Sequence, residues 1–115
     1  MEKKTKCTNE LLAIRDSLEL LGGKWKLVIL RYLINRENEE VHFKKIEREI
    51  EGISAKVLSK ELKDLEENLL LLRIEEGDNR GKVLYQITPY AKTVIPLTDY
   101  LIEWGIIHRE RIKEK

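Results

Sequence analysis

Three lysines at helical spacing are the first feature of this sequence that could do chemistry. Lys56, Lys60 and Lys63 recur within "GISAKVLSKELKDLEENL", Gly52 to Leu69. At about 100° per residue they fall on one side of a helix, and the leucines of the same segment fall on the other. A row of ammonium groups suits an anionic partner such as a nucleic-acid backbone. Most charged helix faces are only solvated, and that alternative applies to this stripe taken alone.

The charges of this segment run against the helix macrodipole. A helix favours acidic residues in its first turn and basic residues in its last turn. Here the lysines come first, whereas Asp64, Glu66 and Glu67 come last. Each misplaced exposed charge costs about 0.3 kcal/mol or more. The order therefore favours a binding role for the lysine end, with the acidic end directed away from an anionic partner.

Cys7 is the second residue with plausible chemistry. As the only cysteine, it excludes a disulfide within the chain and fits a reducing compartment. It lies beside Lys6 and just before the expected start of the first helix near Thr8, and both features favour the thiolate. An inert, partly buried thiol is the alternative.

Other arrangements of reactive residues are weak. His42 and His108 are far apart and have no cysteine or carboxylate at metal-ligand spacing. No phosphate-binding, nucleophile-elbow or zinc-protease motif is present. We therefore expect neither an enzyme nor a cofactor nor a metal site.

Length and composition predict one globular domain over residues 1–115. Hydrophobic residues make up 42% and charged residues 37%, which excludes a disordered chain. A net charge of +1 means that any nucleic-acid interface must rest on local clustering. The N-terminus lacks the apolar run of a secretory signal, and no segment approaches the ~20 apolar residues of a membrane span. A cytoplasmic protein is expected.

Hydrophobic periodicity predicts a mainly α fold with a small β-hairpin. The last helix is expected to start at Thr88-Pro89 and to kink at Pro96. The expected elements are helices over about 8–21, 24–34, 44–50, 54–69 and 88–112, a short strand at 41–43, and hairpin strands over 72–76 and 82–87.

The order of these elements indicates a winged helix-turn-helix. Two helices joined by "EGIS" span about 44–68, and the hairpin at about 72–87 follows as the wing. In this fold the second helix enters the major groove of DNA with its N-terminal residues nearest the bases. The candidate DNA-binding residues are Ser54, Ala55, Lys56, Ser59, Lys60 and Lys63 in that helix, Lys44 and Lys45 in the preceding one, and Arg80 and Lys82 at the wing.

The sequence also resembles a known family. The segments "LLGGKWKLVILRYL", "HFKKIEREIEGISAKVLSKELKDLEEN" and "VLYQITPYAKTVIPLTDYLIEWG", with Cys7 upstream, are similar to the HxlR-type winged helix-turn-helix transcriptional regulators of bacteria and archaea. The resemblance covers Cys7 to Gly105. It implies a homodimeric DNA-binding regulator whose terminal helices form much of the dimer contact. In some members a cysteine near this point senses oxidants or electrophiles. Leu69 stands where the family usually has glycine.

Apolar residues in both terminal helices exceed what one small core can cover. We therefore predict a homodimer that binds a palindromic operator, with each terminal helix folding back on its own domain as the alternative. A winged-helix module for protein–protein contact without DNA binding is the alternative function. The sequence identifies no small-molecule effector. The predicted interface residues are Leu11, Ile14, Leu18, Leu97, Leu101 and Trp104.

Overall fold

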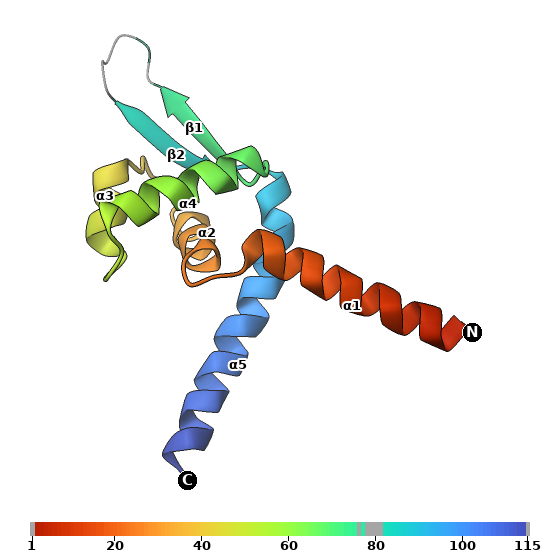
Figure 1. The fold of residues 1–115 in the computed structure, drawn as a ribbon. Coiled ribbons are helices and arrows are strands. Elements are labelled where there is room, and N and C mark those ends of the chain that lie inside the picture. Colours follow the sequence, from red (N-terminus) through yellow and green to blue (C-terminus); the bar gives the residue numbers. More distant parts are fainter. Residues whose placement is uncertain (1, 76, 78–81, 115) are drawn as a thin grey trace.

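A computed structural model describes residues 2–75, 77 and 82–114, with side chains described from Cys7 onward (Figure 1). The described part is mostly helical, with one two-stranded hairpin, as the sequence predicts. The elements are α1 (Glu2–Leu21), α2 (Lys26–Ile34), α3 (Phe43–Glu49), α4 (Ala55–Glu67), β1 (Leu71–Glu75), β2 (Val83–Ile87), the 3-10 helix η1 (Tyr90–Val94) and α5 (Ile95–Lys113).

A winged-helix body carries two projecting helices. Helices α2, α3 and α4 pack together beneath the hairpin, whereas α1 and α5 extend away from this body in different directions (Figure 1). Within the described ranges, no helix is long and apolar enough to span a membrane.

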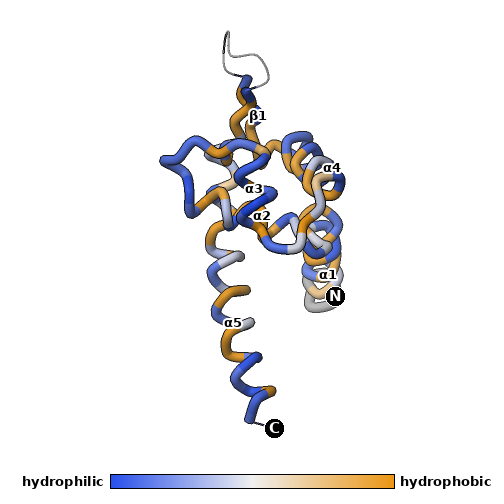
Figure 2. The backbone as a smooth tube through the Cα atoms, turned by 90° about the vertical axis from the view of Figure 1, so that its left-hand side faces the viewer, coloured by the Kyte–Doolittle hydropathy of each residue, from blue (hydrophilic) through white to orange (hydrophobic). Residues whose placement is uncertain are grey.

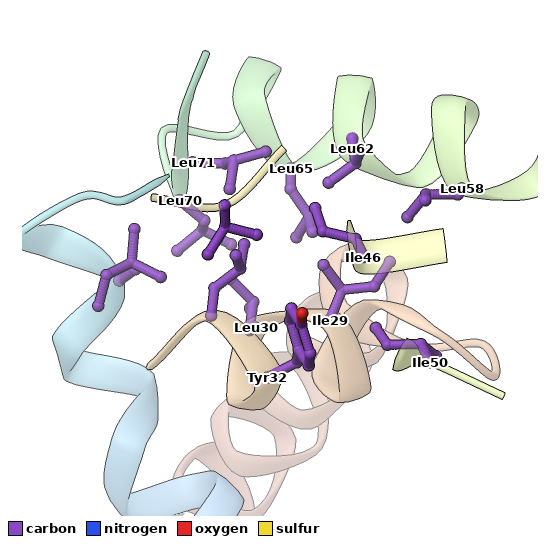
Figure 3. Close-up of a cluster of buried hydrophobic side chains, with 14 of the residues drawn as sticks. Ile29, Leu30, Tyr32, Ile46, Ile50, Leu58, Leu62, Leu65, Leu70 and Leu71 are labelled. Carbon is purple, nitrogen blue, oxygen red and sulfur yellow. The ribbon is translucent and has the colours of Figure 1, made fainter. Parts of the chain in front are cut away.

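The core lies between α4 and α2. Leu58, Leu62 and Leu65 are at most 2% exposed and point from α4 toward α2, where Ile29 and Leu30 are fully buried (Figure 3). Burying each such side chain contributes about 2 kcal/mol. The apolar stripe therefore fixes which face of α4 is turned to solvent.

A tight turn joins α3 to α4. Gly52 has a φ of +90°, a conformation that residues with a Cβ rarely adopt. Ile53 is buried within the turn. The hydroxyl of Ser54 then accepts a hydrogen bond of 3.2 Å from the N–H of Val57, so the predicted N-cap is confirmed.

The antiparallel hairpin pairs Leu71 with Ile87 and Glu75 with Val83, so each strand lies within one residue of its expected bounds. The short strand expected at 41–43 is absent from the described residues. Its place is taken by a single bridge between His42 and Leu84, beside a hydrogen bond from Tyr85 N–H to the Val41 carbonyl.

Both terminal helices differ from the expectation. Helix α1 begins at Glu2, not near Thr8, because the polar residues before Thr8 continue the helix without a proline or glycine to stop it. At the other end, Thr88 caps η1 through its Oγ1, which accepts from Ala91 N–H at 3.0 Å. Pro96 lies in the first turn of α5, directly after the boundary with η1, so the single helix expected over 88–112 is divided into a 3-10 helix and an α-helix at this point.

Helix α4 ends before Leu69, which sequence periodicity had placed in the apolar stripe. Leu69 has a φ of +67° and is 69% exposed. Its N–H bonds to the Glu66 carbonyl at 3.1 Å, and Leu70 N–H bonds to the Leu65 carbonyl at 3.0 Å. These two bonds define a Schellman motif, which favours glycine at the position of Leu69. Leu70, 2% exposed, takes the buried place instead.

Lys26, at the start of α2, forms a shielded ion pair with Glu61 of α4. Its Nζ lies 3.1 Å from Oε2 of Glu61 and 3.4 Å from Oδ2 of Asp64. The side chains of Lys26 and Glu61 are only 14% and 10% exposed. The pair therefore fastens α4 to α2 beside the leucine contacts.

Leu69→Gly should stabilise the protein. A left-handed conformation costs a residue with a Cβ about 1–2 kcal/mol, and glycine avoids that cost. Glycine also loses more conformational entropy on folding, which cancels part of the stabilisation. We expect the free energy of unfolding in urea to rise by about 1 kcal/mol. Leu69→Ala keeps the Cβ and should give no such rise. Equal effects of the two variants would contradict this account of the helix end.

Lys26→Met should destabilise the protein by about 3 kcal/mol, because it leaves the shielded Glu61 carboxylate without its main partner. The double variant Lys26→Met, Glu61→Leu should recover most of that loss, since no unpaired charge remains. Urea unfolding of the single and double variants measures both effects. If Lys26→Met costs less than about 1 kcal/mol, or the double variant shows no recovery, the ion pair does not fasten α4.

Candidate nucleic-acid interface

The lysine face of α4 is turned to solvent along its whole length. This face comprises the six residues that the sequence singles out, all of which are exposed. Lys56 and Lys63 form no ion pair with any residue that the structure describes. Lys60, by contrast, has its Nζ 3.5 Å from Oδ2 of Asp64 and 3.8 Å from Oε1 of Glu61. The face consists of Ser54, Ala55, Lys56, Ser59, Lys60 and Lys63.

The acidic residues of α4 have a structural role that the sequence did not reveal. Partial burial of Asp64 acts to raise its pKa, but the hydrogen bond from Lys26 and the charge of Lys60 outweigh it, so the pKa lies below the usual range. Burial likewise acts to lower the pKa of Lys26, and Glu61 outweighs it. Glu61 and Asp64 thus hold α4 against α2 through Lys26, and this ion pairing offsets part of the unfavourable interaction of Asp64 with the macrodipole.

The other candidate DNA-binding residues differ in exposure and in their ion pairs. Lys44 is exposed and lies 3.5 Å from Glu47, whereas Lys45 is mostly covered and bonds to Glu39 at 2.9 Å. Lys82 is exposed and directly precedes β2. Arg80 lies outside the described residues.

A cleft of about 330 Å³ separates α4 from the hairpin. Arg73 lines it from β1, beside its cross-strand partner Tyr85. Sequence reasoning missed Arg73, although alternation along the strand places it on the same face as buried Leu71. We call this the helix–hairpin cleft; its lining residues are Ser59, Leu62, Lys63, Glu66, Arg73 and Tyr85.

Cys7 lies inside α1, not before it as the sequence suggested, and its thiol is exposed. Because the macrodipole acts mainly within the first turn, the argument for reactivity from the helix end does not apply to this position. His42 instead bonds through Nδ1 to the Val83 carbonyl at 3.2 Å, and His108 stacks on Trp104 with ring centroids 4.8 Å apart. The described residues contain no cluster of three metal-ligating side chains.

Apolar side chains are exposed along both terminal helices. In α1 the exposed fractions are 56% for Leu11, 56% for Ile14 and 62% for Leu18. Figure 2 shows hydrophobic residues recurring along α5 well beyond the body. The predicted interface residues of α5, Leu97, Leu101 and Trp104, are 42%, 47% and 64% exposed.

Known transcriptional regulators resemble this chain in sequence and in fold. An HTH-type transcriptional regulator of Halalkalibacterium halodurans is 42% identical over 90 residues, which cover 78% of each chain. The crystal structure of the HTH-type transcriptional regulator YtcD, a Bacillus subtilis protein, superimposes with a TM-score of 0.76 at 30% identity and covers 84% of this chain and 96% of that one. The structure of the redox regulator HypR in its oxidized form superimposes with a TM-score of 0.72 at 26% identity. The match covers 81% of this chain and 93% of the HypR chain.

The match at family level spans most of the chain. Residues 20–113 match the HxlR-like helix-turn-helix family, a range that runs from the end of α1 through the body to the end of α5. It includes the helix-turn-helix, the hairpin and the projecting C-terminal helix. The chain therefore belongs to the HxlR-like helix-turn-helix family of transcriptional regulators.

Proposed function

We propose that this regulator binds duplex DNA as a homodimer, with α4 in the major groove of each half of a palindromic operator. The observation that carries the proposal is the exposed lysine face of α4, which is held outward by the burial of the opposite face. Lysines near the N-terminal end of such a helix can reach both phosphates and base edges.

The distribution of charge within α4 supports a ranking of its lysines. Lys60 forms ion pairs with Asp64 and Glu61, whereas Lys56 forms none with the described residues. A phosphate that approaches Lys60 must therefore compete with two carboxylates. Lys56 has the larger share of free positive charge and should contribute more to affinity.

The terminal helices support a second copy as the partner. Most helical stability in proteins comes from the packing of an apolar face and not from the intrinsic propensity of the residues. Helix α1 exposes Leu11, Ile14 and Leu18. Two-fold pairing would cover these stripes and place two α4 helices for successive turns of DNA, about 34 Å apart.

A hollow beside α5 favours the same partner surface. A cleft of about 630 Å³ lies between α2 and α5, and Leu101 and Ile102 line it from α5. Both residues also belong to the exposed apolar surface of that helix. A second chain that covered α5 would therefore meet a groove, which gives better packing than a flat face.

A redox response through Cys7 stays a prediction from the family resemblance. Its thiol is exposed, as a reaction with an oxidant requires. The structural relative HypR is described as a redox regulator. The position of Cys7 inside α1 removes the helix-end argument for its reactivity, so it is the weaker part of the proposal.

The double substitution Lys56→Ala, Lys60→Ala should weaken binding to duplex DNA and lower the salt slope of log K by about two, one for each lost phosphate contact. Fluorescence anisotropy over a range of salt concentrations measures both. Lys113→Ala, at the far end of α5, is the control and should leave the slope unchanged. Unaltered binding by the double variant would show that DNA contacts a surface other than the lysine face of α4. A wild-type protein that does not bind the duplex at low salt would instead support the protein-contact module.

Trp104→Glu should dissociate the homodimer, because it places a charge in the predicted apolar contact. Analytical ultracentrifugation should then show one chain of 13.6 kDa, whereas the unchanged protein should show twice that mass. Binding to a palindromic site should weaken by at least about 100-fold, since the two half-sites are no longer linked. Glu103→Lys, on a different face of α5, is the control. A wild-type protein that sediments as a folded monomer would contradict the dimer.

A further inference from the structure

The helix–hairpin cleft joins polar groups from two elements that are far apart in the sequence. The hairpin face toward α4 begins in the core, where the paired residues Leu71 and Ile87 are 1% and 5% exposed. The next pair on the same face is Arg73 with Tyr85, since side chains alternate along a strand. This pair therefore lies outside the core, next to the exposed part of α4. Ser59 and Lys63 of α4 line the same cleft.

Among the described residues, Arg73 forms an exposed ion pair with Glu75 of its own strand and also interacts with Tyr85 across the hairpin. Its Nη1 lies 2.8 Å from Oε1 of Glu75, and the two side chains are 41% and 73% exposed. Exposed ion pairs contribute little to stability, so a stronger anionic partner can replace Glu75 at small cost. A guanidinium also presents two parallel N–H groups that match the oxygens of a phosphate.

We propose that the helix–hairpin cleft binds one phosphodiester group of the DNA backbone. Arg73 donates two hydrogen bonds to the phosphate oxygens, Lys63 supplies a second positive charge, and the hydroxyls of Ser59 and Tyr85 act as further donors. The inference rests on the proposed DNA-binding function and adds to it a site that spans the recognition helix and the hairpin.

The position of the cleft favours a phosphate over a base edge. Ser59, Lys63 and Glu66 lie one to three turns beyond Ser54, the N-cap of α4, whereas base contacts of a recognition helix come mainly from its N-terminal residues. With α4 in the groove and the hairpin beside it, the backbone that borders the groove passes between the two elements. Among the described residues that line the cleft, Glu66 is the one carboxylate, and it should weaken the attraction for a phosphate.

Arg73→Gln tests the site, because glutamine keeps polarity and length but removes the charge. Binding of the full chain to a labelled mixed-sequence DNA duplex is measured over a range of salt concentrations. We expect affinity to fall roughly tenfold, as for a lost charge-assisted hydrogen bond, and the salt slope to fall by about one. The control Arg111→Gln removes an equivalent exposed charge at the end of α5 and should change neither quantity.

Glu66→Gln should act in the opposite direction and tighten binding by roughly threefold, because it removes the opposing charge from the cleft. Misfolding cannot produce that result. If the wild-type protein binds DNA with a steep salt slope but Arg73→Gln keeps that slope, the cleft is not a phosphate site and the proposed function stands. If the wild-type protein does not bind the duplex even at low salt, the proposed function itself fails.

Discussion

Everything in this structure depends on the burial of one face of α4. Leu58, Leu62 and Leu65 leave no freedom in how the helix rotates, and the ion pair between Lys26 and Glu61 fixes it from the side. The lysines must then face solvent. The position of the lysines near the N-terminal end of α4 is unfavourable for the macrodipole. The ion pair between Asp64 and Lys26 offsets part of the corresponding cost of the acidic residues. In our proposal, folding and DNA binding thus use different charges of the same helix.

The remaining elements divide into those that support α4 and those that extend from the body. Helix α2 and the base of the hairpin supply the buried surface beneath it. Helices α1 and α5 meet the body at Leu21 and around Thr98, respectively, and project away from it (Figures 1 and 2). Their projecting parts expose apolar side chains between Leu11 and Leu18 and between Leu97 and Ile112. In our proposal, this division separates DNA contact from dimer contact. A change in how the terminal helices pair would then alter the spacing of the two recognition helices without disturbing either one.

The sequence predicts the body of this fold well because its signals are periodic and local. The leucines of α4 recur at helical spacing, and the side chain of Ser54 caps the helix as expected. Leu69 escaped prediction because its apolar type fits the helical period, whereas its left-handed conformation depends on how α4 meets β1. Arg73 was missed for a related reason. Its proximity to α4 arises from the packing of the hairpin, which no local pattern reports.

The most direct measurement is an NMR titration of isotope-labelled protein with duplex DNA at low and at raised salt. The account predicts that amide signals of residues 54–63 shift most, and that added salt reverses the shifts as counterions compete for the phosphates. It also predicts little change in the buried core around Ile29 and Leu30. Shifts that are confined to α1 and α5, or the absence of any salt-dependent shift in α4, would contradict the central claim.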